Sequence, residues 1–199
     1  MHQLQYDKHA CKIVAGEKID YGIVYGNEKI VFIKTGAGGK IKGKQDKYPM
    51  MANRIHQRLG ATVICASNPD AAYAAQEVAD KGMISEVAAE CGFGEYEVYF
   101  VGTSDGGYQN LLLAQQVPQT RKILGINASL INVEDLIKQL NKLSHVDKVL
   151  VYGTKDEAFQ YIPALQAVGC ENLEIITVEG ANHKFKGMVD EFIALIDLL

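Results

Sequence analysis

Apolar and polar positions follow two alternating patterns along most of this chain. Short apolar runs, which predict buried strands, recur from residue 29 to residue 178. Between these runs, apolar residues recur at helical spacing, which predicts amphipathic helices. The predicted strands cover residues 29–34, 61–66, 98–101, 122–126, 148–152 and 173–178. The predicted helices cover residues 48–59, 70–91, 133–143 and 157–168, with one more after residue 104 and one at the C-terminus.

Glycine positions refine two of these helices. Gly60 directly follows the apolar pattern of residues 48–59 and predicts its end. The alanine-rich segment 70–91 contains Lys81-Gly82, and this glycine predicts an interruption of the helix.

Strands that alternate with helices predict an α/β fold. The sheet is expected to be mainly parallel, with helices on both faces. Residues 10–15 and 19–25 predict a hairpin with its turn near Gly16, which would add an antiparallel N-terminal edge. No repeat, linker or low-complexity segment interrupts the pattern, so we expect residues 1–199 to form one domain.

The composition agrees with a globular protein. Hydrophobic residues make up 48% and charged residues 22% of 199 positions, with a net charge of −4. The polar N-terminus has no secretory pattern, and no apolar run is long enough to span a bilayer. The cysteines are too far apart to suggest a metal site or a dense disulfide framework; they are Cys11, Cys65, Cys91 and Cys170. We therefore expect a cytoplasmic protein without a metal or a nucleic-acid partner.

The segment Gly102-Thr-Ser104-Asp-Gly106 carries the strongest chemical signal. It lies between the apolar run 98–101 and the helical pattern that contains residues 111–114. A G-x-S-x-G sequence between a strand and a helix predicts a sharp turn that exposes a reactive serine at the carboxyl end of a sheet. Glycines flank the serine because a Cβ there would collide with the neighbouring strand and helix. Ser104 is therefore the candidate nucleophile.

A serine nucleophile needs a base and an acid that orients the base. Of the five histidines, only His183 lies in a late loop, between residues 173–178 and the last helix. The acid is expected just after the preceding strand, where Asp156 is the first choice and Glu157 the alternative. The order Ser, Asp, His is one known order for this triad. The other histidines lie before the core, in a helix or in a loop; they are His2, His9, His56 and His145.

These motifs resemble those of serine hydrolases with the α/β-hydrolase fold, over roughly residues 28–199. The resemblance rests on the Ser104 turn, on Gly153-Thr-Lys-Asp156, on Gly180-Ala-Asn-His183 and on Thr35-Gly-Ala-Gly-Gly39. It implies catalysis by Ser104, Asp156 and His183 without a metal or organic cofactor. It further implies that the backbone N–H groups of Ala37 and Asp105 form the oxyanion hole. The family usually has histidine where Thr35 stands, which affects the conformation of the loop but not its backbone donors.

The loop from Thr35 to Lys40 has an alternative interpretation as a phosphate-binding loop. A Walker motif requires Ser or Thr after the lysine, and here Ile41 follows Lys40. Ile41 also occupies the third glycine position of a dinucleotide-binding motif. Both nucleotide patterns therefore fail.

Two further features bear on the substrate. Residues 127–132 are all that connects the strand over 122–126 to its helix, which leaves little room for a cap and predicts an open site for small or polymer-attached acyl substrates. Loops at the predicted catalytic edge are rich in lysine, which favours anionic substrates unless these are ordinary solvated side chains. Lys40, Lys42 and Lys44 are the predicted substrate rim, and the other lysines in these loops are Lys47, Lys155, Lys184 and Lys186.

The sequence thus predicts a hydrolase of carboxylic esters or thioesters that forms an acyl-enzyme on Ser104. The alternative is a non-catalytic binding or scaffold protein that keeps the same fold. The pattern leaves the acyl group, the leaving group and the oligomeric state open.

Overall fold

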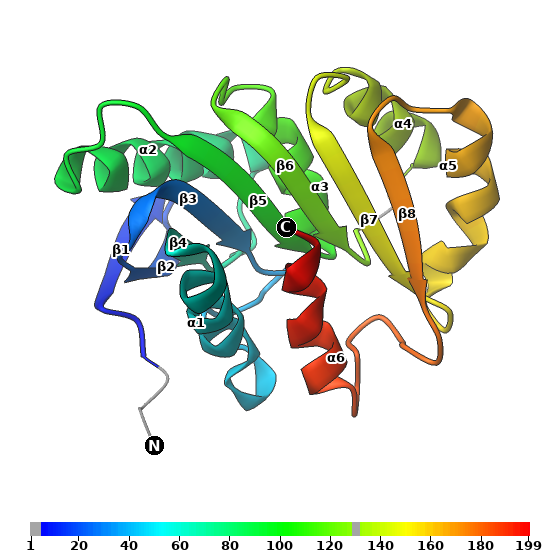
Figure 1. Cartoon of the computed structure of the whole chain (residues 1–199), viewed down its shortest axis with the longest axis horizontal. Helices are drawn as coiled ribbons and strands as arrows, with labels where there is room; N and C mark the ends of the chain where they lie inside the picture. Colours follow the sequence, from blue (N-terminus) through cyan, green and yellow to red (C-terminus); the bar gives the residue numbers. More distant parts are fainter. Residues whose placement is uncertain (1–4, 129–131) are drawn as a thin grey trace.

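A computed structural model describes residues 5–128 and 132–199. Its centre is an eight-stranded sheet with the order β1-β2-β4-β3-β5-β6-β7-β8 (Figure 1). Every neighbouring pair from β4 to β8 is parallel, whereas β2 is antiparallel to both β1 and β4. The strands are β1 (Lys8–Val14), β2 (Glu17–Val24), β3 (Asn27–Lys34), β4 (Ala61–Ala66), β5 (Glu97–Thr103), β6 (Thr120–Ile126), β7 (Asp147–Gly153) and β8 (Leu173–Val178). The predicted parallel sheet with an antiparallel N-terminal edge is confirmed.

Helices cover both faces of the sheet, as predicted (Figure 1). On one face, α1 (Lys47–Leu59) and α6 (Val189–Ala194) pack around Val31, Val63 and Val151. The other face is covered by α2 (Tyr73–Glu90), α3 (Asp105–Ala114), α4 (Val133–Asn141) and α5 (Ile162–Val168). Short 3₁₀ segments cover Lys44–Asp46, Glu157–Tyr161 and Leu195–Leu198. Strands buried on both faces explain why their sequences are continuous apolar runs.

The helix predicted over residues 70–91 differs from the observed one in two respects. It begins at Tyr73, since residues 68–72 form an irregular turn in which the carbonyls of Pro69 and Ala71 accept from the side-chain amide of Gln76. It also continues through Gly82 without interruption. Buried residues on both sides of this glycine, such as Ala79 and Met83, pack on the sheet and outweigh the weak helix propensity of glycine.

The connection from β6 to α4 spans six residues, 127–132, of which residues 129–131 lie outside the described part. The short connection therefore agrees with the predicted absence of a large cap. All four cysteines are in the described residues, and none forms a disulfide. Within the same residues, no helix is both long and apolar enough to cross a membrane, and no group of three His, Cys, Asp or Glu side chains is arranged to hold a metal ion.

Candidate active site

Ser104 lies in the turn between β5 and α3, with its backbone in the left-handed region at φ 53°. A side chain rarely adopts this conformation, so the turn stores strain. The flanking glycines are sterically required. A Cβ on Gly102 would lie 2.4 Å from the Cα of Gly107, and a Cβ on Gly106 would lie 2.3 Å from the carbonyl oxygen of Thr35. The turn therefore needs the glycines that the motif supplies.

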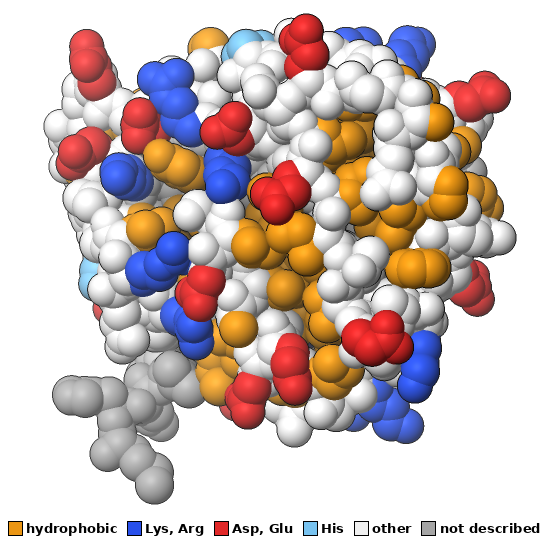
Figure 2. Space-filling view, turned by 45° about the vertical axis from the view of Figure 1, so that its right-hand side comes forward, with side chains coloured by type: hydrophobic (Ala, Val, Ile, Leu, Met, Phe, Trp, Pro, Cys, Tyr) orange, Lys and Arg blue, Asp and Glu red, His pale blue; other side chains and the backbone are white. Residues whose placement is uncertain are grey.

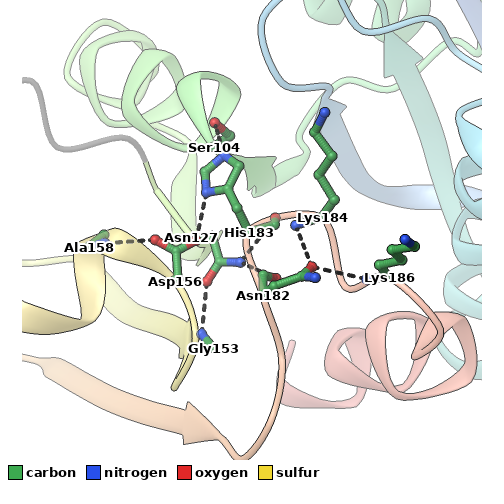
Figure 3. Close-up of polar contacts among 9 residues, drawn as sticks. All are labelled: Ser104, Asn127, Gly153, Asp156, Ala158, Asn182, His183, Lys184 and Lys186. Carbon is green, nitrogen blue, oxygen red and sulfur yellow. Dashed lines mark hydrogen bonds and ion pairs between the residues drawn. The ribbon is translucent and has the colours of Figure 1, made fainter.

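The three residues predicted for the triad form one chain of hydrogen bonds (Figure 3). The Nε2 atom of His183 is 2.8 Å from the Ser104 hydroxyl oxygen, and its Nδ1 atom is 2.6 Å from Oδ2 of Asp156. A carboxylate only accepts hydrogen bonds, so Nδ1 donates to it. Nε2 of the neutral ring is then free to accept from the serine. This arrangement is the one that general-base activation of a serine requires.

Asp156 differs sharply in exposure from the histidine that it contacts. The Asp156 side chain is 2% exposed, whereas that of His183 is 47% exposed. Asp156 also caps the following 3₁₀ turn, since its Oδ1 atom accepts from the Ala158 amide at 2.7 Å. Glu157, the alternative acid, is exposed. The carboxylate that meets the histidine is therefore the first choice of the sequence analysis, and it is fixed at both oxygens.

Asn127 holds the histidine loop and was not singled out from the sequence. It follows β6 directly, is fully buried, and lies between Asp156 and the loop in Figure 3. Its side-chain amide donates to the carbonyls of Asn182 and His183 at 3.3 and 3.1 Å, while its Oδ1 atom accepts from the Gly153 amide at 2.9 Å. A polar residue immediately after a buried strand was the available sequence signal.

The predicted oxyanion donors come from two elements that meet beside Ser104. Asp105 is the first residue of α3, where backbone N–H groups have no partner within the helix. The loop of Ala37 approaches closely, because a Cβ on Gly36 would lie 3.3 Å from the Cβ of Ser104. Neither the Ala37 amide nor the Asp105 amide donates to another group among the described residues. Both are free to bind an oxygen.

A buried asparagine joins these two elements. The side-chain amide of Asn68 donates to the Thr35 carbonyl at 3.1 Å and to Oδ2 of Asp105 at 2.9 Å. Its backbone donates to the Gly39 carbonyl at 3.1 Å and accepts from the Gly38 amide at 2.8 Å. Asn68 thus fixes the loop of one predicted donor against the residue that supplies the other. In the sequence, Asn68-Pro69-Asp70 predicts only a turn and a helix cap at this position.

A cavity of about 510 Å³ opens beside Ser104 and His183. Its apolar wall includes Tyr48, Phe185 and Val189. Within the part of the chain that the structure describes, five lysines also line it and no Asp or Glu does; the lysines are Lys40, Lys44, Lys47, Lys184 and Lys186. Of the three lysines of the predicted substrate rim, Lys42 does not line the cavity. A larger hollow of about 720 Å³ lies along α1 and the C-terminal segment, away from this hydrogen-bond chain.

The other three described histidines lie outside the hydrogen-bond chain of Ser104, His183 and Asp156. Nδ1 of His56 in α1 is 3.0 Å from the Ala61 carbonyl, and His9 packs edge-on against Tyr6. His145 is exposed before β7, and His2 lies outside the described residues.

Comparison with known proteins connects this geometry to a fold class. Est1E from Butyrivibrio proteoclasticus matches with a TM-score of 0.75 at 12% identity over 96% of each chain, and another structure of Est1E holds ferulic acid. An α/β serine hydrolase homologue from Coxiella burnetii matches with a TM-score of 0.74 at 16% identity over 98% of each chain. XC6422 from Xanthomonas campestris, described as a serine hydrolase without a lid, matches with a TM-score of 0.68 at 15% identity over 98% of this chain and 95% of its own.

These matches establish the fold. The chain has the α/β-hydrolase fold, as its motifs predicted, and lidless hydrolases are among the structures that it resembles. No protein-family model matches the chain, and no curated protein sequence does.

Proposed function

We propose that this protein is a serine hydrolase that cleaves carboxylic esters or thioesters through an acyl-enzyme on Ser104. The observation that carries the proposal is the continuous hydrogen-bond chain from Ser104 through His183 to the buried Asp156. The likeness to structures described as serine hydrolases supports hydrolysis in general.

In the proposed reaction, His183 accepts the Ser104 proton as the serine oxygen attacks the acyl carbon. Asp156 keeps the imidazole in the tautomer that accepts at Nε2 and stabilises the imidazolium that forms. The amides of Ala37 and Asp105 donate to the oxyanion, and losing one such donor typically costs about 3–4 kcal/mol of transition-state stabilisation. His183 then protonates the leaving alcohol or thiol, and water activated by the same histidine releases the acid. No step requires a metal or organic cofactor.

The cavity suggests the kind of substrate. Its volume of about 510 Å³ and its partly apolar wall fit a small acyl group, while the exposed His183 leaves the site open to solvent. An open site also accommodates an acyl group attached to a larger carrier. The lysines around the cavity favour a substrate with negative charge.

A fluorophosphonate probe tests the proposal, because it reacts with an activated serine and not with an ordinary one. Intact mass should show one adduct on the wild-type protein and none on Ser104→Ala. Ser85→Ala, which removes an exposed serine of α2, is the matched control and should label fully. Hydrolysis of 4-nitrophenyl esters and acyl thioesters should be lost with the same variant. An unlabelled wild-type protein without hydrolysis would favour a binding or scaffold protein instead.

A further inference from the structure

Lys47 has an unusual environment for a lysine. It is the first residue of α1, lines the cavity beside Ser104 and is half-buried. Its ammonium nitrogen lies 4.1 Å from the ring centroid of Phe192 and 5.0 Å from that of Tyr48. Both rings are buried. The aromatic faces attract the cation and hold it at the cavity wall.

This ammonium has no carboxylate partner among the described residues. Lys47 forms neither an ion pair nor a side-chain hydrogen bond there, whereas Lys8, Lys12, Lys18 and Lys34 each pair with an acid. On the face shown in Figure 2, where the side of β8 and α5 comes forward, Lys and Arg side chains are interspersed with Asp and Glu. Among the described residues, by contrast, the cavity is lined by lysines and by no acid. Its lining therefore carries an excess of positive charge.

Burial partly destabilises the charged form of Lys47 in the free protein, despite its contact with the two aromatic rings. Burial lowers its pKa from 10.5 to about 8, which means that the surroundings disfavour the charged form. Lys47 also stands at the N-terminal end of a helix, where the backbone dipole is positive, and the first turn of α1 contains no acid. A bound anion would relieve both effects. Charged groups placed this way are common at ligand sites.

Lys47 is also connected to the turn that presents Ser104. The hydroxyl of Tyr48, the next residue, is 2.8 Å from Oγ1 of Thr103, which directly precedes Ser104. An anion bound at Lys47 would therefore occupy the same cavity as an acyl group at Ser104, beside the ring of Tyr48.

We propose that Lys47, seated on Tyr48 and Phe192, is the anion subsite of this cavity, and that the enzyme prefers esters carrying a carboxylate a few bonds from the scissile carbonyl. The proposal rests on the hydrolase function of Ser104. The exposed lysines of the cavity increase the local potential, while Lys47 gives the anion a fixed position.

The other titratable groups near Lys47 must be considered when its loss of a proton is followed with pH. Tyr48 stays neutral, since burial raises its pKa to about 12. Asp46 precedes α1 and Glu191 lies on α6, but both are exposed and neither lines the cavity. The other titratable side chains of the cavity are Lys40, Lys44, His183, Lys184 and Lys186.

Matched substrates test the subsite directly. They are the 4-nitrophenyl half-esters of succinic, glutaric and adipic acid, each compared with its 4-nitrophenyl methyl diester. For the best chain length, Lys47→Gln should lower kcat/KM for the half-ester by about tenfold or more relative to any change it causes for the diester, so that the ratio of the two values falls. Lys42→Gln is the control, because it removes the same charge from an exposed residue outside the cavity. A preference that is equal in wild type and Lys47→Gln at every chain length would overturn the proposal.

The pH dependence gives a second readout. As pH rises from 7 to 9.5, Lys47 loses its proton, so the wild-type preference for the half-ester in kcat/KM should fall. Lys47→Arg keeps its charge over this range and should retain the preference. A wild-type preference that is constant over this range would contradict the assignment to Lys47.

Binding separates failure of this proposal from failure of the proposed function. Calorimetry on Ser104→Ala should show tighter binding of the half-ester than of the diester, and adding Lys47→Gln should remove the difference. If the proposed hydrolysis is wrong, neither ester is cleaved and Ser104 is not labelled, yet this binding difference still tests the subsite. Equal binding of both esters to Ser104→Ala would refute it.

Discussion

The side-chain amide of Asn127 donates to the backbone carbonyl of His183 at 3.1 Å, so the end of β6 fixes the loop of the proposed base. The same side chain accepts from the Gly153 amide at the end of β7, three residues before Asp156. One buried residue therefore sets the positions of the segments that carry the base and its acid.

We expect Asn127→Ala to lower both stability and activity. The substitution leaves a buried amide and two carbonyls without their partner, at about 1–3 kcal/mol for each unsatisfied group. For a chain of this length, each kcal/mol lowers Tm by about 2–4 °C. Well below its Tm, the variant should also react more slowly with fluorophosphonate, because the histidine is less well positioned. Thermal unfolding and labelling rates measure the two effects.

Asn110→Ala is the control for this prediction. Asn110 is buried in α3, and neither polar atom of its side chain has a hydrogen-bond partner among the described residues. It therefore loses the same side-chain volume without breaking a hydrogen bond. Equal effects of the two substitutions would show that Asn127 acts only by filling space.

Replacing the acid should separate Asp156 from its neighbour. Asp156→Asn should reduce kcat by about three to four orders of magnitude, since an asparagine amide no longer holds the histidine in the required tautomer. The asparagine oxygen can still accept from Ala158, so the helix cap and the fold should persist. Glu157→Gln should stay within about twofold of wild type, because Glu157 is exposed. Steady-state kinetics on both variants measures the two effects. A larger loss of kcat in Glu157→Gln than in Asp156→Asn would assign the role of the acid to Glu157.

Asn68 should act as a positioning residue for the oxyanion hole. Asn68→Ala removes the donors to Thr35 and Asp105, which loosens both predicted oxyanion donors together. Interactions made only in the transition state affect kcat more than KM, so kcat should fall by about 10- to 100-fold with KM little changed. Binding of a boronic acid, which mimics the tetrahedral intermediate, should weaken in parallel.

Gln76→Ala provides the comparison for Asn68. Gln76 is equally buried and holds the same turn through the carbonyls of Pro69 and Ala71, but among the described residues its side chain forms no hydrogen bond with either oxyanion element. A purely structural role of the turn predicts similar kinetic losses in both variants. A loss of kcat and boronate affinity confined to Asn68→Ala supports positioning.

The main elements of the fold could be predicted because each depends on local sequence. The Ser104 turn is specified by glycines whose absent side chains leave room for neighbouring backbone, and this requirement is visible in the sequence. The antiparallel edge follows from two short strands separated by Gly16. The predicted break at Gly82 was wrong because long-range packing of α2 against the sheet, which the local pattern does not contain, decides the outcome.

The supporting residues of the site depend on contacts between distant segments. Asn68 and Asn127 each follow a buried strand, but their partners lie about 30 to 60 residues away in sequence. The lysines show the same limit. Lys42 and Lys47 both follow β3, yet of these two only Lys47 lines the cavity, and Gln45 and Asp46 between them adopt left-handed conformations. The spacing of the lysines gives no indication of these conformations.

The exposed lysines of the cavity should steer anionic substrates in a salt-dependent way. The screening length falls from about 30 Å at 0.01 M salt to about 10 Å at 0.1 M, so long-range attraction weakens over this range. We expect kcat/KM for a 4-nitrophenyl half-ester to fall with salt, while the neutral diester barely responds. Replacing Lys40, Lys44 and Lys184 together by Gln should flatten the response, whereas Lys42→Gln should reduce it less.

The half-buried Lys47 is screened less than exposed charges, so the preference that it confers should persist at 0.1 M. Equal salt dependence for both esters would identify the exposed lysines as ordinary solvated side chains.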